Sequence, residues 1–299
     1  MTEAIANGPG RVDAHAHVFG TASEERRVVD ELAPGDRCAD VDELWRAADQ
    51  VGVSGLVLVP LDTDDATAAA ALAAHPGRCA GVAVAGPEDL GDDGPDHLVR
   101  RRERYRFDAV RMMWIGEPGR PLETSPAWPL LRTMADRDLV LWAYLGPDQT
   151  PFLADLARAL PDLRVVLNHL GFAPTGMIVD EHRRPRFPGA LDRATVDRVL
   201  ALAENPRMHL MVSGHYALTR TGWPYDDLAS ETRRLVGAYG AERCLWGSDF
   251  PWPSDQPGYA ATLESVTRML TDLSAAELAL VLGGTARQLF SNAFAEENV

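Results

Sequence analysis

Apolar runs alternate with amphipathic stretches along nearly the whole of this 299-residue chain, and this alternation restricts the fold more than any other feature of the sequence. The runs are almost continuously apolar, which is typical of strands buried on both faces of a parallel sheet. A strand followed by a helix, repeated many times, is the pattern of a βα unit. Eight such runs lie at residues 11–15, 54–59, 79–85, 109–114, 139–145, 163–168, 208–213 and 244–247.

Stretches with helical periodicity separate these runs, at residues 41–50, 64–74, 127–137, 150–159, 190–203, 225–239 and 257–270. Eight strands that alternate with helices predict an α/β fold, a (β/α)8 barrel of the TIM type that forms a single domain over residues 1–299. The alternative is an open, doubly wound sheet, but no Gly-x-Gly-x-x-Gly follows the first run, which disfavours its nucleotide-binding form. The longest irregular stretch, residues 171–189, predicts a functional or mobile loop.

The charge and the cysteines argue against several classes of partner and site. A formal net charge of −15 at pH 7 disfavours nucleic acid or an anionic membrane as a partner, because both select surfaces rich in Lys and Arg. Cys38, Cys79 and Cys244 form no Cys-x-x-Cys, so we expect neither a disulfide framework nor a thiolate metal site. We find no signal-peptide pattern and no apolar stretch of the roughly 18 residues that a membrane span requires. We therefore expect a cytoplasmic protein with no membrane partner.

Polar residues gather where the expected strands end. In a barrel of this type the active site lies at the carboxyl ends of the strands, so polar residues there are candidates for chemistry. Such residues stand within or directly after six of the eight runs, and we expect their side chains to meet at one mouth of the barrel. They are His15, His17, Arg111, Tyr144, Asn168, His169, Ser213, His215, Ser248 and Asp249.

Three of the histidines and one aspartate have the composition of a metal site. His15 and His17 are two residues apart on a strand, so their imidazoles point to the same face. Joined by His169 and Asp249, they would supply three nitrogen ligands and one oxygen ligand, which suits one divalent ion, with Zn²⁺ the first choice. The other interpretation is an ordinary strand end with partly exposed histidines. The chain contains no lysine, so no carbamylated lysine can bridge two metals.

The motifs, in their order along the chain, resemble those of the amidohydrolase superfamily, and within it the amidohydrolase 2 branch. They are Val12-Asp13-Ala14-His15-Ala16-His17, Val110-Arg111, Asn168-His169-Leu170-Gly171, Val212-Ser213-Gly214-His215-Tyr216 and Leu245-Trp246-Gly247-Ser248-Asp249-Phe250-Pro251. Gly222-Trp223-Pro224-Tyr225-Asp226-Asp227 is similar to a stretch of the sugar-lactone and 2-pyrone-4,6-dicarboxylate lactonase group, so the chain resembles that group most. The related decarboxylases are a more distant match.

The resemblance implies either one metal ion, held by His15, His17, His169 and Asp249, or catalysis without a metal, as in some lactonases of the branch. Many metal-dependent amidohydrolases place a ligand at the end of the fifth strand. No His or Lys closes the fifth run here, and Tyr144 stands near that position. The expectation is therefore one divalent ion, zinc first, or none.

The resemblance also implies a substrate-binding role for Arg111. It corresponds to an arginine that binds a substrate carboxylate in the pyrone-dicarboxylate lactonases, and a guanidinium suits a carboxylate in a bidentate fashion. Two further arginines of those enzymes correspond to Glu117 and to a position near Ala217. A dicarboxylate substrate is therefore not expected.

Aromatic residues near the strand ends are further candidates for substrate binding. We assign this role to Tyr144, Trp114 and Trp252, which would suit a less charged, cyclic or aromatic substrate. Trp223 and Phe250 lie in similar loops. The alternative for all of them is plain packing, which is common for aromatic residues in such loops.

These residues predict an enzyme that opens a lactone or a related cyclic ester by attack of water. Asp249 would take a proton from water and pass it to the leaving alkoxide. A metal ion on the histidines, or the imidazoles themselves, would polarise the carbonyl. His169 and His215 are the other candidate catalytic residues. His215 would orient substrate or supply a ligand, or it is an ordinary hydrogen-bonded histidine.

Two other functions stay open at this stage. One is a metal-dependent non-oxidative decarboxylase of an aromatic or unsaturated acid, in which a histidine such as His215 would protonate the carbanion. The other is a catalytically inactive barrel used as a binding protein. The expected partner is a small-molecule substrate, and a homo-oligomer is left open. We interpret Arg183, Arg184 and Arg186 as a solvated cluster, because exposed charges usually need no partner.

Overall fold

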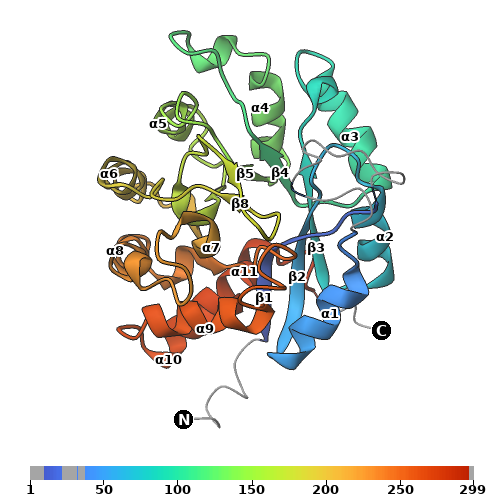
Figure 1. The fold of residues 1–299 in the computed structure, drawn as a ribbon. Coiled ribbons are helices and arrows are strands. Elements are labelled where there is room, and N and C mark those ends of the chain that lie inside the picture. Colours follow the sequence, from blue (N-terminus) through green and yellow to red (C-terminus); the bar gives the residue numbers. More distant parts are fainter. Residues whose placement is uncertain (1–9, 22–31, 33–37, 296–299) are drawn as a thin grey trace.

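The structure is a computed structural model that describes residues 10–21, 32 and 38–295. The chain forms a (β/α)8 barrel in which eight parallel strands are surrounded by helices (Figure 1). Around the barrel the strands are β1 (Arg11–His17), β2 (Val53–Val59), β3 (Cys79–Val84), β4 (Ala109–Met112), β5 (Val140–Ala143), β6 (Val165–Leu167), β9 (Met208–Val212) and β10 (Cys244–Trp246). The predicted fold is confirmed, and each of the eight predicted runs overlaps one strand.

Each predicted helical stretch also contains a helix. The helices outside the barrel include α1 (Val41–Gln50), α2 (Ala66–Ala74), α3 (Gly94–Arg104), α4 (Trp128–Asp136), α5 (Phe152–Ala159), α6 (Arg193–Leu202), α8 (Ala229–Tyr239) and α9 (Tyr259–Met269). Shorter helices are α7 (His215–Leu218), α10 (Ala275–Ala279) and α11 (Thr285–Leu289). Within the described ranges, no helix combines the length and the apolar character that crossing a membrane requires.

Helix α3 was not among the predicted helices, and its contacts explain why. Its sequence is mostly charged, and Leu98 is its only fully buried large apolar side chain. It is held instead by the buried Arg101, whose guanidinium contacts Asp65 at 2.5 Å and Asp89 at 2.9 Å and donates a hydrogen bond to the Val84 carbonyl. A helix anchored through a buried cation gives little apolar periodicity for sequence reasoning to detect.

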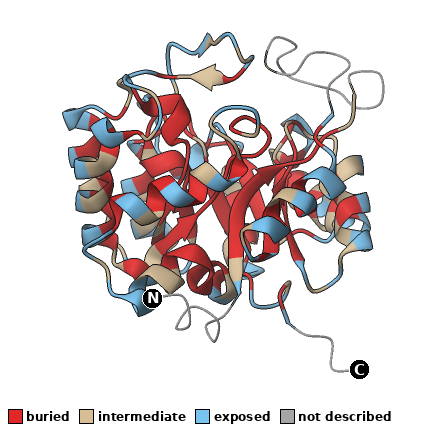
Figure 2. Cartoon of the chain, turned by 60° about the horizontal axis from the view of Figure 1, so that its bottom comes forward, coloured by how far each residue is buried: buried red, intermediate tan, exposed pale blue. Residues whose placement is uncertain are grey.

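Two apolar layers form the core. One lies between the strands and the surrounding helices, and the other fills the barrel interior with inward-facing side chains such as Val57, Val82 and Trp142. Helix α11 supplies Ala286 and Leu289 to the inner layer. Buried residues therefore concentrate on the strands, while the outer faces of the helices are exposed (Figure 2). Valine is frequent on these strands because its branched side chain fits a pleated, buried surface.

The barrel closes where the two ends of the sequence meet. The backbone N–H of His17 donates to the Phe250 carbonyl at 2.8 Å, and that of Asp249 donates to the His15 carbonyl at 2.8 Å. Strand β1 therefore lies beside the segment that follows β10. This seam brings together the motif that carries His15 and His17 and the motif that carries Asp249.

The stretch 171–189 is more ordered than predicted. It contains a small antiparallel hairpin of β7 (Ile178–Val179) and β8 (Pro185–Arg186). The interpretation of its arginines as a solvated cluster is wrong for Arg184, which is buried, pairs with Asp180 at 2.8 Å and donates to the Gln256 carbonyl. Its guanidinium also lies 5.5 Å from the centre of the Tyr216 ring. Charge pairing inside the hairpin, which sequence spacing alone did not reveal, buries this cation.

Candidate active site

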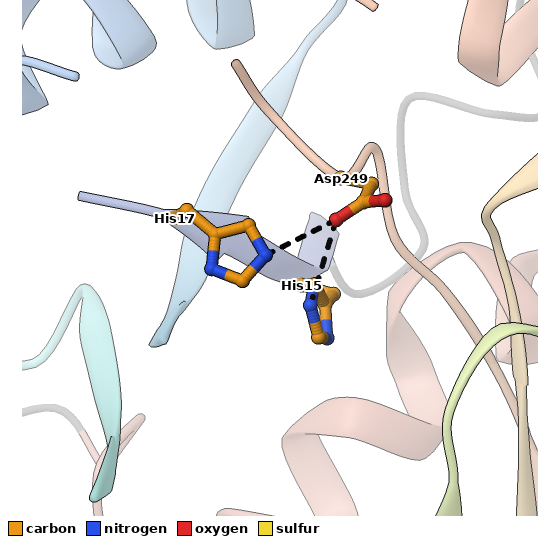
Figure 3. Close-up of side chains that lie close together, drawn as sticks. All are labelled: His15, His17 and Asp249. Atoms are coloured by element: carbon orange, nitrogen blue, oxygen red, sulfur yellow. Dashed lines mark ion pairs between the residues drawn. The ribbon is translucent and has the colours of Figure 1, made fainter. Parts of the chain in front are cut away.

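His15 and His17 on β1 and Asp249 after β10 converge at the mouth of the barrel. The Nε2 atom of His17 lies 3.3 Å from Oδ1 of Asp249, and Nε2 of His15 lies 3.6 Å from the same oxygen (Figure 3). All three side chains are buried. The predicted convergence of these residues is therefore present, although their chemical roles stay a prediction.

Asp13 joins the two motifs, a part of the site that sequence reasoning missed. Its carboxylate accepts hydrogen bonds from the Ser248 backbone N–H at 2.8 Å, the Ser248 hydroxyl at 2.5 Å, the Tyr259 hydroxyl at 2.8 Å and the His15 backbone N–H at 3.2 Å. The one available signal was a carboxylate within a strand that also carries His15 and His17. Asp13 fixes the position of β1 relative to the loop that carries Asp249.

Asp249 and His169 both have left-handed backbone conformations, with φ of 62° and 46°. Such values are uncommon for residues other than glycine, and they persist only where the surrounding structure enforces them. At Asp249 the hydrogen bonds across the seam supply this constraint. The local strain at these two positions is typical of side chains that a fold holds in a fixed direction for function.

His169, which follows β6, lies beside the same carboxylate. Its Nε2 is 4.0 Å from Oδ2 of Asp249, and its Nδ1 contacts the Ser213 hydroxyl at 2.8 Å. Gly214 is needed next to it, because a Cβ there would come within 2.8 Å of the imidazole and the backbone has φ of 71°. The Ser-Gly pair after β9 thus positions His169.

Tyr216 was not assigned a role from the sequence, yet it contacts the central carboxylate. Its hydroxyl donates a hydrogen bond to Oδ2 of Asp249 at 2.8 Å. Burial raises the pKa of Tyr216 well above its usual range, so it stays a donor. With Oδ2 occupied in this way, Oδ1 is the oxygen that remains for water or a cation.

The ionisation states of this cluster fit Asp249 as a base that lies beside neutral imidazoles. Burial opposes ionisation of Asp249, but His169, His17 and His15 around it outweigh this effect, so the pKa of Asp249 lies well below its usual range. Burial lowers the pKa of His169 to about 4 and also lowers that of His15. At neutral pH Asp249 is therefore ionised, while His15 and His169 are neutral.

Hydrogen bonds select the tautomers of His15 and His17. The carbonyl of Val59 contacts Nδ1 of His17 at 2.9 Å and can only accept, so Nδ1 of His17 carries a proton. The indole N–H of Trp142 donates to Nδ1 of His15 at 3.1 Å, so the proton of neutral His15 lies on Nε2. The planes of the imidazole and the indole are within 15° of parallel, and their ring centres are 6.0 Å apart.

The residues fit a single cation in composition and position. One atom each of His15, His17 and Asp249 lies within 4.8 Å of the others. In neutral His17 the Nε2 lone pair faces Oδ1 of Asp249, so a proton or a cation is required between two electron-pair donors. Neither Oδ1 of Asp249 nor Nε2 of His15 has a hydrogen-bond partner among the described residues. These atoms could hold one divalent ion, although His15 would first lose its Nε2 proton.

A cavity of about 180 Å³ opens above this cluster. Its polar lining comes from side chains at the carboxyl ends of the strands, including Arg111 on β4 and Tyr144 directly after β5. Trp252 also lines it, as expected of a substrate-binding residue. The polar lining residues are His17, Arg111, Tyr144, His169, Tyr216 and Asp249.

Two of the candidate residues lie elsewhere. Trp114 does not line the cavity and is 36% exposed, because β4 ends at Met112 and the preceding residue, Met113, turns toward the cavity instead. His215 is buried against α8, where its Nε2 lies 3.3 Å from the Thr232 hydroxyl and its ring stacks on Tyr225. The hydrogen-bonded alternative describes His215 better than a catalytic role does.

Comparison with known proteins identifies the family. The chain matches the amidohydrolase family over residues 12–291. It is similar to the L-fucono-1,5-lactonase of Burkholderia ambifaria, with 29% identity over 182 residues that cover 57% of this chain and 55% of that enzyme. The match thus spans little more than half of the length of that relative.

Solved structures agree over a greater length. A protein described as a 2-pyrone-4,6-dicarboxylic acid hydrolase from Pseudomonas putida has 26% identity and a TM-score of 0.69, with 94% of this chain and 97% of that chain covered. A zinc-bound amidohydrolase from Burkholderia multivorans has 20% identity and a TM-score of 0.70, with 94% and 99% covered, which is a likeness of fold. Since the family match extends from the first strand of the barrel to its last helix, the chain belongs to the amidohydrolase family and to its amidohydrolase 2 branch.

Proposed function

We propose that this protein is a hydrolase that opens a lactone by attack of water, on one barrel domain over residues 1–299. The observation that carries the proposal is the convergence of Asp249 with three histidines beneath the cavity, with Oδ1 of Asp249 free of hydrogen bonds among the described residues. An ionised carboxylate with one free oxygen is suited to accept a proton from a bound water. The similarity to a fuconolactonase supports the same reaction class.

The proposed reaction begins with a water held by Oδ1 of Asp249. Asp249 takes its proton as the water oxygen bonds to the lactone carbonyl carbon. When the ring C–O bond breaks, Asp249 returns the proton to the leaving alkoxide, and the product is a hydroxy acid. His169 lines the cavity beside Asp249 and would donate a hydrogen bond to the developing oxyanion. The low pKa of Asp249 keeps it available as a base throughout neutral pH.

We propose that His15, His17 and Asp249 hold one divalent ion, and zinc suits two imidazoles and a carboxylate. Such an ion, when bound, polarises the carbonyl and lowers the pKa of the attacking water. This chemistry complements Asp249, because a carboxylate of low pKa is a weak base. Binding at His15 requires loss of the hydrogen bond from Trp142, so we expect the ion to exchange readily.

The test combines metal removal with a panel of lactones. We expect proton release from at least one lactone, a loss of activity of roughly 100-fold after dialysis against a chelator, and recovery with one equivalent of zinc. The measurements are a pH-indicator assay and metal analysis of the same samples. Release of CO2 from a carboxylated aromatic, with no lactone opened, would contradict the proposal. The decarboxylase alternative lacks its expected proton donor, because His215 faces Thr232.

Trp142→Phe is expected to raise the affinity for zinc about tenfold, because no indole N–H then opposes the tautomer of His15 that ligates through Nε2. A competition titration with a chromophoric chelator measures the affinity, and nitrogen NMR of His15 reports the tautomer. The matched control is Trp246→Phe, since Trp246 is equally buried but its indole N–H has no partner among the described residues. Equal affinity and tautomer in both variants would refute the assignment.

A further inference from the structure

The cavity is lined by polar side chains at the strand ends, here called its floor, and by apolar side chains of the loops that follow the strands, here called its walls. This composition constrains the substrate. The walls include Leu61, Met113, Phe172, Met177, Phe187 and Trp252. Resting on the hydrolase function proposed above, we infer that the substrate is a lactone with an apolar, ring-containing body and a single carboxylate. The walls would hold the body and Arg111 would bind the carboxylate.

Apolar walls disfavour a polyhydroxylated lactone. A sugar lactone carries several hydroxyl groups, and each one placed against a methionine or phenylalanine side chain loses its hydrogen bonds to water without replacement. Tyr144 and Tyr216 are the hydroxyl-bearing side chains among the described lining residues. The Tyr216 hydroxyl donates to Asp249, and the Tyr144 ring lies under the Arg111 guanidinium. The described walls therefore offer dispersion contacts with a planar or aliphatic ring and little else.

No carboxylate among the described residues forms an ion pair with Arg111, and Asp249 acts on it only at longer range. The Arg111 side chain is buried, its Nε has no hydrogen-bond partner among those residues, and its guanidinium lies 4.5 Å from the centre of the Tyr144 ring. A ring face compensates a buried cation only partly, whereas a ligand carboxylate would accept two N–H donors at once. Arg111 also lines the cavity, so its guanidinium is placed to meet a ligand there.

A second carboxylate would have no cation to bind. Arg111 is the only arginine among the described residues that line the cavity. Ala217 lines the wall with a methyl group, and Glu117 lies in solvent, where it pairs with Arg120. A second carboxylate would thus be buried among apolar side chains at a large loss of hydration. The chemistry available fits one anionic group.

Four lactones distinguish the contribution of the single carboxylate from that of the apolar body of the substrate. The probes are 2-oxochroman-4-carboxylate, its uncharged parent dihydrocoumarin, 2-pyrone-4,6-dicarboxylate and L-fucono-1,5-lactone. We expect kcat/KM for the oxochroman carboxylate to exceed that for each of the other three by roughly 100-fold. A preference for the sugar lactone or the dicarboxylate, or equal values for the carboxylate and its parent, would overturn the inference while the hydrolase function stands. Turnover of none of the four would overturn both.

Two substitutions test the carboxylate-binding arginine and the apolar wall separately. Arg111→Met is expected to lower kcat/KM for the oxochroman carboxylate roughly 100-fold and that for dihydrocoumarin less than about threefold. The matched control is Arg193→Met, because this side chain is 92% exposed on α6. Met177→Gln, a change of similar size on the exposed part of the wall, should lower kcat/KM for both bicyclic lactones about tenfold and that for fuconolactone by less. Equal losses on the charged and uncharged lactones in Arg111→Met would refute carboxylate binding by this residue.

Discussion

Replacement of Asp249 by asparagine is expected to lower kcat roughly 1,000-fold while the protein stays folded. Asparagine fills the same volume and can still accept a hydrogen bond from Tyr216, but it cannot take a proton from water. Because the proposed mechanism passes the proton through this carboxylate twice, no neighbouring group replaces it. The measurement is the steady-state rate on the best lactone at several pH values between 6 and 8.

Two further variants show whether the lost group is the carboxylate itself. Asp226→Asn makes the same chemical change at an exposed residue and should leave kcat unchanged. Tyr216→Phe removes the hydrogen bond to Oδ2 but keeps the carboxylate, and we expect a loss of about tenfold. If Asp249→Asn kept more than a tenth of the activity, Asp249 would not be the proton carrier.

The same substitution also has a consequence for stability. Asp249 is a buried carboxylate that lies beside His15, His17 and His169. Because its pKa is lower in the folded protein than its ordinary value, the ionised carboxylate stabilises the folded state at neutral pH. We therefore expect the melting temperature of Asp249→Asn at pH 7 to lie below that of the parent protein.

Sequence reasoning predicted the barrel well because strands buried on both faces leave a strong local signal. Each of the eight apolar runs overlaps a strand, with ends displaced by at most two residues. Helix α3 was missed because a buried Arg101 replaces the apolar stripe that such reasoning looks for. The hairpin of β7 and β8 was missed because Arg184 and Asp180 stabilise it by charge pairing within a polar stretch. A local apolar pattern in the sequence contains no information about charge pairs such as those of Arg101 and Arg184.

In the candidate site, too, residues with a local sequence signal were predicted and residues that depend on tertiary contacts were missed. His15, His17, His169 and Asp249 were found from the sequence because each ends or follows a predicted strand, and parallel strands in a barrel end at one mouth. Tyr216 and Trp142 were missed because their roles depend on which atoms they touch across the barrel. His215 is the opposite case, since a polar residue after a strand can face a neighbouring helix instead of the cavity, as the hydrogen-bonded alternative for this residue expects.

Asp13→Ala is expected to lower the free energy of unfolding by about 3 kcal/mol at pH 7.5. Alanine would leave the Ser248 backbone N–H and the hydroxyls of Ser248 and Tyr259 buried without their acceptor. The loss is smaller than the sum of these contacts, because burial already disfavours the charged carboxylate and raises the pKa of Asp13 to about 6. Urea unfolding followed by tryptophan fluorescence gives the free energy.

The pH dependence of this effect has a definite sign. Since the pKa of Asp13 is higher in the folded protein than its ordinary value of 3.8, the folded state binds more protons between pH 4 and 6. The contribution of Asp13 to stability is therefore greatest below pH 4, falls as the pH rises to about 6, and is constant above it. Asp13→Ala should abolish this slope, whereas Asp96→Ala, on the exposed face of α3, should keep it.

A stability loss alone would leave open whether Asp13 also assembles the site, and a rescue variant decides this. Asp13→Asn keeps one acceptor for the Ser248 N–H, and the two hydroxyls can rotate toward other partners, so we expect it to restore most of the stability. If Asp13 positions β1 against the Asp249 loop, Asp13→Asn should still show a weaker zinc affinity and a lower kcat than the parent. Full activity in a variant that lacks the carboxylate would mean that the seam hydrogen bonds of His15 and His17 hold the site by themselves.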